Sequence, residues 1–362
     1  MMLADAHLHL FRNGFPGLYG ESLLRPDIEV YENLRRAHGI AAGLVVGYEG
    51  EGIDPANNAY ICALAAERPW MHTVAYADVH SAPSADVVTT ILESGHAGVA
   101  LYVTDPAKGA AAAAYPTSAW NALHQGRALV SLNTVQECLA LITPAIENFS
   151  GCTFLISHMG LPGSYRQPLA MADAEARLAP LLRLAALPNV MVKISAPYAI
   201  SDPAFSYPLV AAKPFLDLIL NRFGAERYLW GSDFSPALDH VSFAQTISYP
   251  WLERLGDVDR ALVMGGIFCG CWPAPRNSRA DYRPITPPIT WTSAAAVSVS
   301  SAPNSMPQVL HMHRGSNLAA AGMQLDRRPR DIVMLEGDGV AINPVKPRDC
   351  PLLSMPVMRL AS

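Results

Sequence analysis

Residues 3–9 of the chain read Leu-Ala-Asp-Ala-His-Leu-His, an apolar run that ends in two histidines. Successive side chains of a strand point to opposite faces, so a strand over residues 3–9 places His7 and His9 on the same face. An open, doubly wound sheet that binds a dinucleotide would carry Gly-x-Gly-x-x-Gly after its first strand, and this segment has none. The stretch therefore favours a closed barrel, provided that enough strands follow it.

Seven further apolar runs of strand length follow along the chain. They cover residues 40–48, 71–77, 98–103, 128–134, 153–158, 190–195 and 228–233. Amphipathic segments lie between them, at residues 28–38, 57–67, 135–149, 172–187 and 208–223. The runs are continuous and do not alternate with polar residues, as expected for parallel strands that are buried on both faces. Eight strand and helix units of roughly 30 residues each predict an α/β fold, a (β/α)8 or TIM barrel over residues 1–266.

The composition describes an ordinary globular protein with small-molecule partners. Of the 362 residues, 51% are hydrophobic and 16% are charged, and the net charge is -5, which excludes a disordered or collagen-like chain. No run of lysines and arginines is present, so neither nucleic acid nor an anionic membrane is an expected partner, whereas a homo-oligomer stays open. With no signal-peptide pattern and no apolar stretch of about 18 residues, the expected location is the cytoplasm. The six cysteines show no C-x-x-C spacing, which argues against a disulfide framework or a structural zinc site.

Polar residues at the ends of the predicted strands are the candidates for an active site, because barrel enzymes place their chemistry at the carboxyl ends of the strands. The sixth strand ends in Ser-His-Met-Gly, which brings His158 to the mouth. The eighth ends in Trp-Gly-Ser-Asp, which brings Asp233 beside the first strand once the barrel closes. Each residue alone has a structural explanation, but His7, His9, His158 and Asp233 together predict an active site.

Four segments in the same order along the chain resemble a known family. They are Asp-Ala-His-Leu-His-Leu-Phe from residue 5, Ile-Ser-His-Met-Gly from residue 156, Val-Lys-Ile-Ser-Ala-Pro-Tyr from residue 192 and Leu-Trp-Gly-Ser-Asp-Phe from residue 229. Over about residues 1–266 the sequence resembles the amidohydrolase-related family, in particular its metal-dependent-hydrolase and 2-pyrone-4,6-dicarboxylate-lactonase-like branch. The resemblance implies a hydrolase that opens a lactone, or a related ester or amide, of a small carboxylic or sugar acid.

The same resemblance implies roles for the strand-end residues and leaves the metal open. His7, His9 and Asp233 match the family's ligands on the first and eighth strands, and His158 matches its sixth-strand histidine. Zinc-using members have a further histidine at the end of the fifth strand, where this chain has Asn133, a poor zinc ligand. His7, His9 and Asp233 could hold zinc or manganese with water, but the lactonase-like branch, which also lacks that histidine, is taken to work without metal. No organic cofactor is expected.

The expected mechanism is attack of water on a carbonyl carbon. Asp233 takes a proton from the water, while His158 and the pair His7 and His9, or a metal that the pair holds, stabilise the oxyanion. No G-x-S-x-G motif suggests a nucleophilic serine. Two alternatives stay open, namely a metal-dependent decarboxylase of the same superfamily, which the lack of a fifth-strand histidine disfavours, and an inactive barrel that binds a metabolite.

Further polar residues near the mouth are predicted to bind the substrate. They are Tyr102, Asn133, Tyr165, Arg166, Lys193, Ser195 and Tyr198. The resemblance implies an arginine after Tyr198 for a dicarboxylate substrate, and the chain has Ala199 there, which disfavours such a substrate. Of the remaining histidines, His80 and His240 are candidates for the rim of the site, and the strand or helix positions of three others suggest structural roles: His72, His96 and His124.

Residues 267–362 do not continue the barrel pattern. They hold 12 of the 30 prolines and show no sustained helical or strand period, which predicts an irregular tail. Back-translation of residues 267–273 one base earlier permits Asn, then Phe or Leu, and later Leu and Ala, the start of a terminal helix. We hypothesise a frame slip near codon 266, which resequencing of the gene would test. The His-Met-His triplet at residues 311–313 has no predicted strand beneath it, so no function is expected for it.

Overall fold

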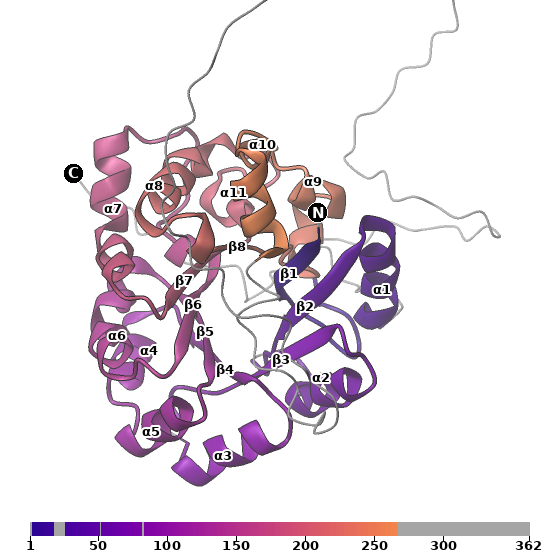
Figure 1. The fold of residues 1–362 in the computed structure, drawn as a ribbon, viewed down its shortest axis with the longest axis vertical. Coiled ribbons are helices and arrows are strands. Elements are labelled where there is room, and N and C mark those ends of the chain that lie inside the picture. Colours follow the sequence, from indigo (N-terminus) through magenta and orange to yellow (C-terminus); the bar gives the residue numbers. More distant parts are fainter. Residues whose placement is uncertain (1, 18–25, 51, 82, 267–362) are drawn as a thin grey trace, which may run out of the picture. The chain divides into compact units, whose positions relative to one another are not determined.

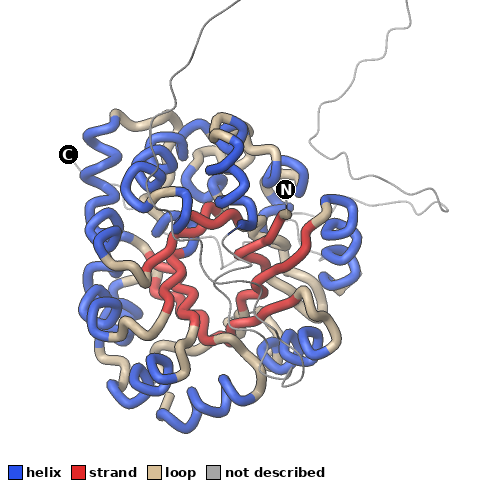
Figure 2. The backbone as a smooth tube through the Cα atoms, viewed as in Figure 1, coloured by secondary structure: helices blue, strands red, loops and turns tan. Residues whose placement is uncertain are grey.

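The computed structural model describes residues 2–17, 26–50, 52–81 and 83–266. Eight parallel strands follow one another in chain order around a ring, and the helices lie outside it (Figure 1, Figure 2). The strands are β1 (Leu3–Leu8), β2 (Ile40–Val46), β3 (Met71–Tyr76), β4 (Gly98–Val103), β5 (Leu129–Thr134), β6 (Thr153–Ile156), β7 (Val190–Ile194) and β8 (Tyr228–Trp230). The predicted (β/α)8 barrel is confirmed.

The ring is completed where the end of β8 meets β1. The Asp233 amide donates to the His7 carbonyl over 2.8 Å, and the His9 amide donates to the Phe234 carbonyl. Gly231 permits this close approach, because a Cβ at that position would lie 2.7 Å from the His7 Cβ. The first motif and the eighth-strand motif are therefore held together by main-chain bonds.

Helices connect successive strands, and most predicted helix positions are confirmed. They are α1 (Asp27–His38), α2 (Asn57–Ala66), α3 (Ala85–Glu93), α4 (Pro106–Ala113), α5 (Thr117–Gln125), α6 (Gln136–Asn148), α7 (Met171–Arg183), α8 (Lys213–Phe223), α9 (Phe243–Ile247), α10 (Pro250–Glu253) and α11 (Asp257–Ala261). The helix predicted from residue 208 begins later, at Lys213, because Leu209 has a left-handed backbone with φ 57°. A 3-10 turn over Val210–Ala212 leads into α8 instead.

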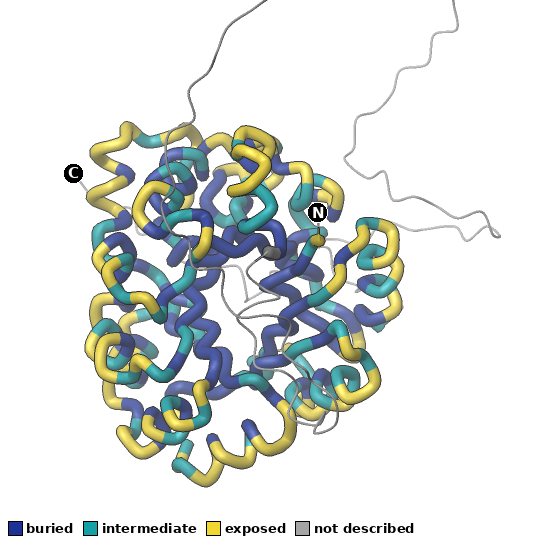
Figure 3. The backbone as a smooth tube through the Cα atoms, in the orientation of Figure 1, coloured by how far each residue is buried: buried dark blue, intermediate teal, exposed yellow. Residues whose placement is uncertain are grey.

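The apolar core has two layers, as the continuous apolar strands predicted. Figure 3 shows the ring of strands buried and the outer faces of the helices exposed. One large cluster fills the space between strands and helices, and a smaller one, with Leu44, Val74, Leu129 and Leu155 among its members, fills the inside of the barrel. The interior below the mouth is therefore packed, and polar chemistry is confined to the strand ends.

The described chain ends in a turn, η7 (Leu262–Gly266), that contacts β1 and β8 and buries Val263 and Met264. The predicted irregular tail, the frame slip and the triplet at residues 311–313 lie outside the described residues. Within the described residues, no helix has the length and apolar character to cross a membrane.

Candidate active site

Two histidines and an aspartate meet at the seam between β1 and β8. The Nε2 atoms of His7 and His9 are 3.2 Å apart, and Oδ1 of Asp233 lies 3.4 Å from the first and 3.6 Å from the second. All three side chains are buried. The predicted convergence of the first and eighth strand ends therefore holds in the structure.

The second nitrogen of each histidine has its own partner. His9 Nδ1 lies 2.8 Å from the carbonyl oxygen of Val46, so Nδ1 carries a proton and Nε2 faces His7 and Asp233. His7 Nδ1 lies 3.2 Å from Lys193 Nζ and 3.3 Å from Ser157 Oγ. Burial, with Lys193 and the neighbouring rings of His158 and His9, holds the pKa of His7 well below its usual value, so His7 is neutral.

Asp233 follows β8, which ends at Trp230 and not at the predicted residue 233, and its backbone is left-handed with φ 55°. Its Oδ2 accepts a hydrogen bond of 2.5 Å from the Tyr198 hydroxyl. Burial by itself raises the pKa of Asp233, but the His158 and His9 rings and the Tyr198 hydroxyl outweigh burial, so the pKa lies below its usual value. Asp233 is therefore an ionised carboxylate with Oδ2 fixed and Oδ1 directed at the histidine pair.

His158 follows β6, and its imidazole ring lies edge-on to that of His7 with centroids 4.6 Å apart. Its Nδ1 lies 2.9 Å from Ser195 Oγ, and the same oxygen accepts from the His158 amide at 3.3 Å. The buried hydroxyl proton of Ser195 then has Nδ1 as its acceptor, which leaves the proton of the neutral ring on Nε2. Burial lowers the pKa of His158. A neutral ring with an Nε2–H donor can stabilise a negative oxygen.

Lys193 is fully buried, and its Nζ donates to Ser131 Oγ at 2.8 Å beside His7. Burial lowers the pKa of Lys193 to about 7. The side chain thus lies under the histidines, in contact with His7. Ser131 was not predicted, although it lies two residues before Asn133 and therefore on the same face of β5.

Asp5 holds the seam together from behind the site and was also not predicted. Its carboxylate accepts from the amide of Ser232 at 2.8 Å, the Ser232 hydroxyl at 2.5 Å, the Tyr31 hydroxyl at 2.9 Å and the His7 amide at 3.2 Å. Burial raises the pKa of Asp5 to about 6. Since Ser232 precedes Asp233, these bonds fix both halves of the site. The only sequence signal is a charged residue inside an apolar strand.

The residues present fit a divalent metal ion. Tetrahedral zinc with bonds of about 2.0 to 2.2 Å separates its ligand atoms by about 3.3 to 3.6 Å, close to the triangle of His7 Nε2, His9 Nε2 and Asp233 Oδ1. Two imidazoles and a carboxylate are a common donor set in catalytic zinc sites. Ligand atoms of His7, His158 and Asp233 also lie within 4.8 Å of one another, but the Ser195 hydrogen bond leaves a proton on the Nε2 of His158, which favours His9 as the third ligand.

The opposite side of the mouth is aromatic. Tyr48, Tyr76 and Tyr102 come from the ends of β2, β3 and β4, and their ring centroids lie 4.8 to 5.8 Å apart. Asn133 lies beside Tyr102 in the sheet, and its buried Oδ1 has no hydrogen-bond partner among the described residues. We call these four residues the aromatic side, and His7, His9, His158 and Asp233 the reacting side. Tyr48 and Tyr76 were not predicted as part of the site.

Two predicted substrate residues are not brought to the reacting side. The Arg166 side chain is 83% exposed and pairs with Asp202 at 2.9 Å, and the Tyr165 hydroxyl donates to the carbonyl of Pro162. Lys193, Ser195 and Tyr198 do lie at the site. Each of them, however, contacts a residue of the reacting side. For Tyr102 and Asn133, contact with substrate stays a prediction.

The structure also shows the contacts of the other histidines named from the sequence. His240 stacks on the Tyr198 ring at 4.5 Å, next to the site. His96 is buried against the Thr73 hydroxyl, and His124 accepts from the Gly151 amide. His72 is partly buried within β3, and the amide of His80 donates to Asp78.

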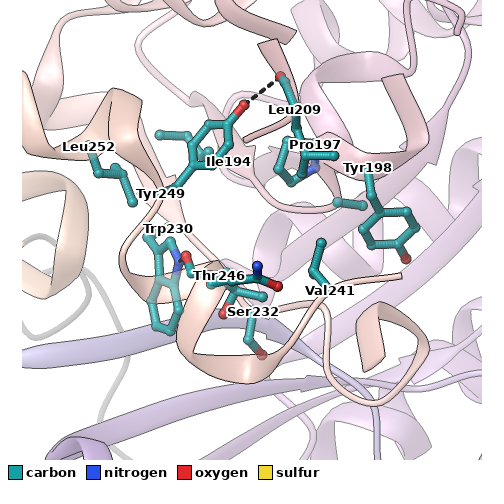
Figure 4. Close-up of a pocket in the computed structure, with 13 residues that line it drawn as sticks. Ile194, Pro197, Tyr198, Leu209, Trp230, Ser232, Val241, Thr246, Tyr249 and Leu252 are labelled. Carbon is teal, nitrogen blue, oxygen red and sulfur yellow. Dashed lines mark hydrogen bonds between the residues drawn. The ribbon is translucent and has the colours of Figure 1, made fainter. Parts of the chain in front are cut away.

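A small apolar pocket lies behind the reacting side, between the ends of β7 and β8 and the segment that contains α9 and α10 (Figure 4). Its lining includes Trp230, Val241, Tyr249 and Leu252. The polar atoms of Trp230 and Tyr249 are satisfied, because the indole donates to the Thr246 carbonyl and the hydroxyl to the Leu209 carbonyl. The walls are mostly apolar, and the lining includes none of the four side chains His7, His9, His158 and Asp233, so this pocket is separate from the place where those side chains meet.

A family model described as amidohydrolase matches residues 4–266. The chain belongs to the amidohydrolase family. The resemblance found in the four motifs is thereby confirmed, together with the expectation of a hydrolase of this superfamily.

This amidohydrolase is 30% identical over 154 residues to an L-fucono-1,5-lactonase from Burkholderia ambifaria, a match that covers 38% of this chain and 50% of the relative. The chain thus spans about half the length of this curated relative. Among solved structures, an amidohydrolase from Burkholderia multivorans with bound zinc has a TM-score of 0.61 at 20% identity, covering 75% of this chain and 100% of that one. A probable 2-pyrone-4,6-dicarboxylic acid hydrolase from Acinetobacter baumannii with citric acid bound has a TM-score of 0.57 at 14% identity, covering 75% and 98%. These structures share the barrel fold.

Proposed function

We propose that this amidohydrolase hydrolyses a sugar lactone that carries no charge, and so opens its ring to the sugar acid. The observation that carries the proposal is the ionised Asp233, which is fixed at Oδ2 by Tyr198 and faces the two histidines with Oδ1. A buried carboxylate with one free oxygen is a general base for water, and the neutral His158 beside it is a hydrogen-bond donor for the oxyanion.

The reaction proceeds in two steps that use these groups. The oxygen of water bonds to the lactone carbonyl carbon while Asp233 accepts the water proton, and His158 Nε2–H donates to the oxygen that becomes negative. The bond between the carbonyl carbon and the ring oxygen then breaks, and the ring oxygen takes the proton from Asp233. The product is an open-chain hydroxy acid, and Asp233 is again a carboxylate.

A divalent ion held by His7, His9 and Asp233 would supply a Lewis acid that polarises the carbonyl. Zinc is bound in the amidohydrolase from Burkholderia multivorans. With an ion on Nε2, the proton of His7 would lie on Nδ1 and be donated to Ser157 or to the neutral amine of Lys193, whose pKa of about 7 makes that form available.

The charges around the mouth favour a neutral substrate. The described loops that follow the strands contain two arginines, and both pair with carboxylates, Arg12 with Asp54 at 3.3 Å and Arg166 with Asp202 at 2.9 Å. A dicarboxylate would meet no free guanidinium there. A hydroxylated ring could pack on the tyrosines and donate to the free oxygen of Asn133. The partial match to an L-fucono-1,5-lactonase supports the same class of substrate.

The test is an assay of the purified full chain. The chain should hydrolyse L-fucono-1,5-lactone or related sugar lactones and prefer them to 2-pyrone-4,6-dicarboxylate, with Asp233→Asn as the inactive control. Elemental analysis for zinc and manganese, and assays after chelation and after metal is restored, establish whether the ion is needed. Preference for the dicarboxylate, or full activity of Asp233→Asn, contradicts the proposal.

A further inference from the structure

The turn after β6 holds four consecutive residues in a left-handed backbone conformation. The φ angles of His158, Met159, Gly160 and Leu161 are 53°, 56°, 69° and 41°. Glycine adopts such angles freely, but a Cβ crowds the backbone at positive φ. Because of this turn, β6 ends at Ile156, whereas the sequence predicted a strand that continues to residue 158. Other parts of the molecule must hold it, because the direction of the His158 side chain depends on it.

Gln136 makes the contacts that hold this turn. It is the first residue of α6 and is 2% exposed. Its Nε2 donates to the carbonyl of Gly160 at 2.8 Å and to that of Met159 at 3.3 Å, and its Oε1 accepts from the Leu181 amide of α7 at 3.3 Å. An amide side chain has two N–H donors and one carbonyl, so each polar group has a partner.

Gly160 leaves the space that the Gln136 amide occupies. A Cβ on Gly160 would lie 2.4 Å from Gln136 Nε2, and the φ of 69° is unfavourable for any other residue. The Gln136 amide therefore fits at this turn only because residue 160 is a glycine. Ser195 fixes the imidazole of His158 at Nδ1, whereas Gln136 fixes the main chain beneath it.

We propose that Gln136 is a positioning residue for the hydrolytic reaction, which orients His158 through the carbonyls of Met159 and Gly160. Gln136 itself bonds neither His158 nor the other reacting residues among its recorded contacts. The kinetic part of this inference rests on the proposed function. Loss of the two donors should let the turn relax and move the Nε2–H of His158 away from the oxyanion.

Gln136→Met tests the proposal, because methionine has a similar length and no donor. We expect kcat to fall about 10- to 100-fold while KM changes by less than about 3-fold. Asn189→Leu is the matched control, since the Asn189 amide donates to the carbonyls of Ile146 and Cys152 at the opposite end of the barrel. That variant should lose stability and keep its kcat within about 2-fold.

A double variant distinguishes loss of His158 positioning from a general loss of packing. In the His158→Ala background, Gln136→Met should lower kcat by less than about 2-fold, because the residue that it orients is gone. A full additional loss there, or an unchanged kcat in the folded single variant, overturns the proposal. If Gln136→Met does not fold, Gln136→Asn takes its place with the same expectations, because its amide is one methylene short of both carbonyls.

Nitrogen NMR of the histidine rings gives a readout that needs no substrate. The His158 signals, assigned by their loss in His158→Ala, should show a protonated Nε2 and should change in Gln136→Met but not in Asn189→Leu. An unchanged His158 signal in Gln136→Met overturns the positioning role even if the wild-type chain opens no lactone. Absence of lactone hydrolysis in the wild-type chain, with the NMR change present, contradicts only the proposed function.

Discussion

The two sides of the barrel mouth differ in how their polar groups are held. On the reacting side buried partners hold the side chains: Tyr198 fixes Oδ2 of Asp233, and Ser195 fixes the ring of His158 together with its proton. On the aromatic side the tyrosine rings pack on one another, and no group in the described part of the chain bonds the buried oxygen of Asn133. Fixed protons suit a proton transfer, and a surface with an open acceptor suits a bound ring. Changes on the first side should therefore lower kcat, and changes on the second should raise KM.

The largest expected effect is that of Asp233→Asn on the reacting side. The amide keeps the shape of the side chain but cannot take a proton from water, so kcat/KM should fall by about 10³-fold or more. Steady-state kinetics on the proposed lactone substrate measure the loss, and circular dichroism checks that the variant is folded. If the variant retains a tenth of the wild-type rate, Asp233 is not the base and the contrast between the two sides fails.

Lys193, which contacts His7, allows the two sides of the mouth to be compared by the pH dependence of the free energy of unfolding. Its pKa is about 7 in the folded chain, against an ordinary value of 10.5, so between these values the unfolded chain binds a proton that the folded chain lacks. The free energy of unfolding should therefore rise with pH, by about 2 to 4 kcal/mol from pH 7 to pH 10. Denaturant unfolding at several pH values should show this rise in the wild type and not in Lys193→Met.

The control for that experiment comes from the aromatic side. Burial raises the pKa of Tyr102 well above 10 in the folded chain, so the phenol stays protonated there. In the unfolded chain it begins to ionise only near pH 10, so its effect on the slope is small. Tyr102→Phe should keep the wild-type slope of stability against pH. Equal slopes in the wild type and in Lys193→Met would show that the buried amine is not the source of the pH dependence of stability.

Tyr198→Phe should have a smaller effect than loss of the base. The variant keeps the ring that stacks on His240 and loses the hydrogen bond to Asp233. Because that bond lowers the pKa of Asp233, the acid limb of the pH profile of kcat/KM should move to higher pH, and kcat should fall about 10-fold. A profile that superimposes on that of the wild type would show that Tyr198 does not act on Asp233.

Sequence patterns predicted the barrel and the convergence of the four strand-end residues on one mouth because both depend on short-range regularities. Parallel strands buried on both faces read as continuous apolar runs, and the residues at their ends reach one mouth whatever the loops do. The partners of those residues were not predictable in the same way. Lys193 on β7 contacts His7 on β1, and Tyr198 after β7 contacts Asp233 after β8. These residues are far apart along the chain, and no spacing in the sequence encodes such pairs. The left-handed turn from His158 to Leu161 was signalled in part by Gly160, but its length was not, because methionine and leucine give no signal for positive φ.

The smallest expected effect lies on the aromatic side itself, where Tyr102→Leu removes a ring that contacts Tyr48 and Tyr76. If the tyrosines only bind the substrate, KM should rise about 3- to 10-fold, equivalent to about 1 kcal/mol, while kcat stays within about 2-fold. The conservative Tyr102→Phe keeps the ring and should be nearly neutral, which separates packing on the ring from hydrogen bonding by the hydroxyl. A fall in kcat without a change in KM would mean that the aromatic side takes part in the chemical step, and that the division of the mouth into a reacting side and a binding side is wrong.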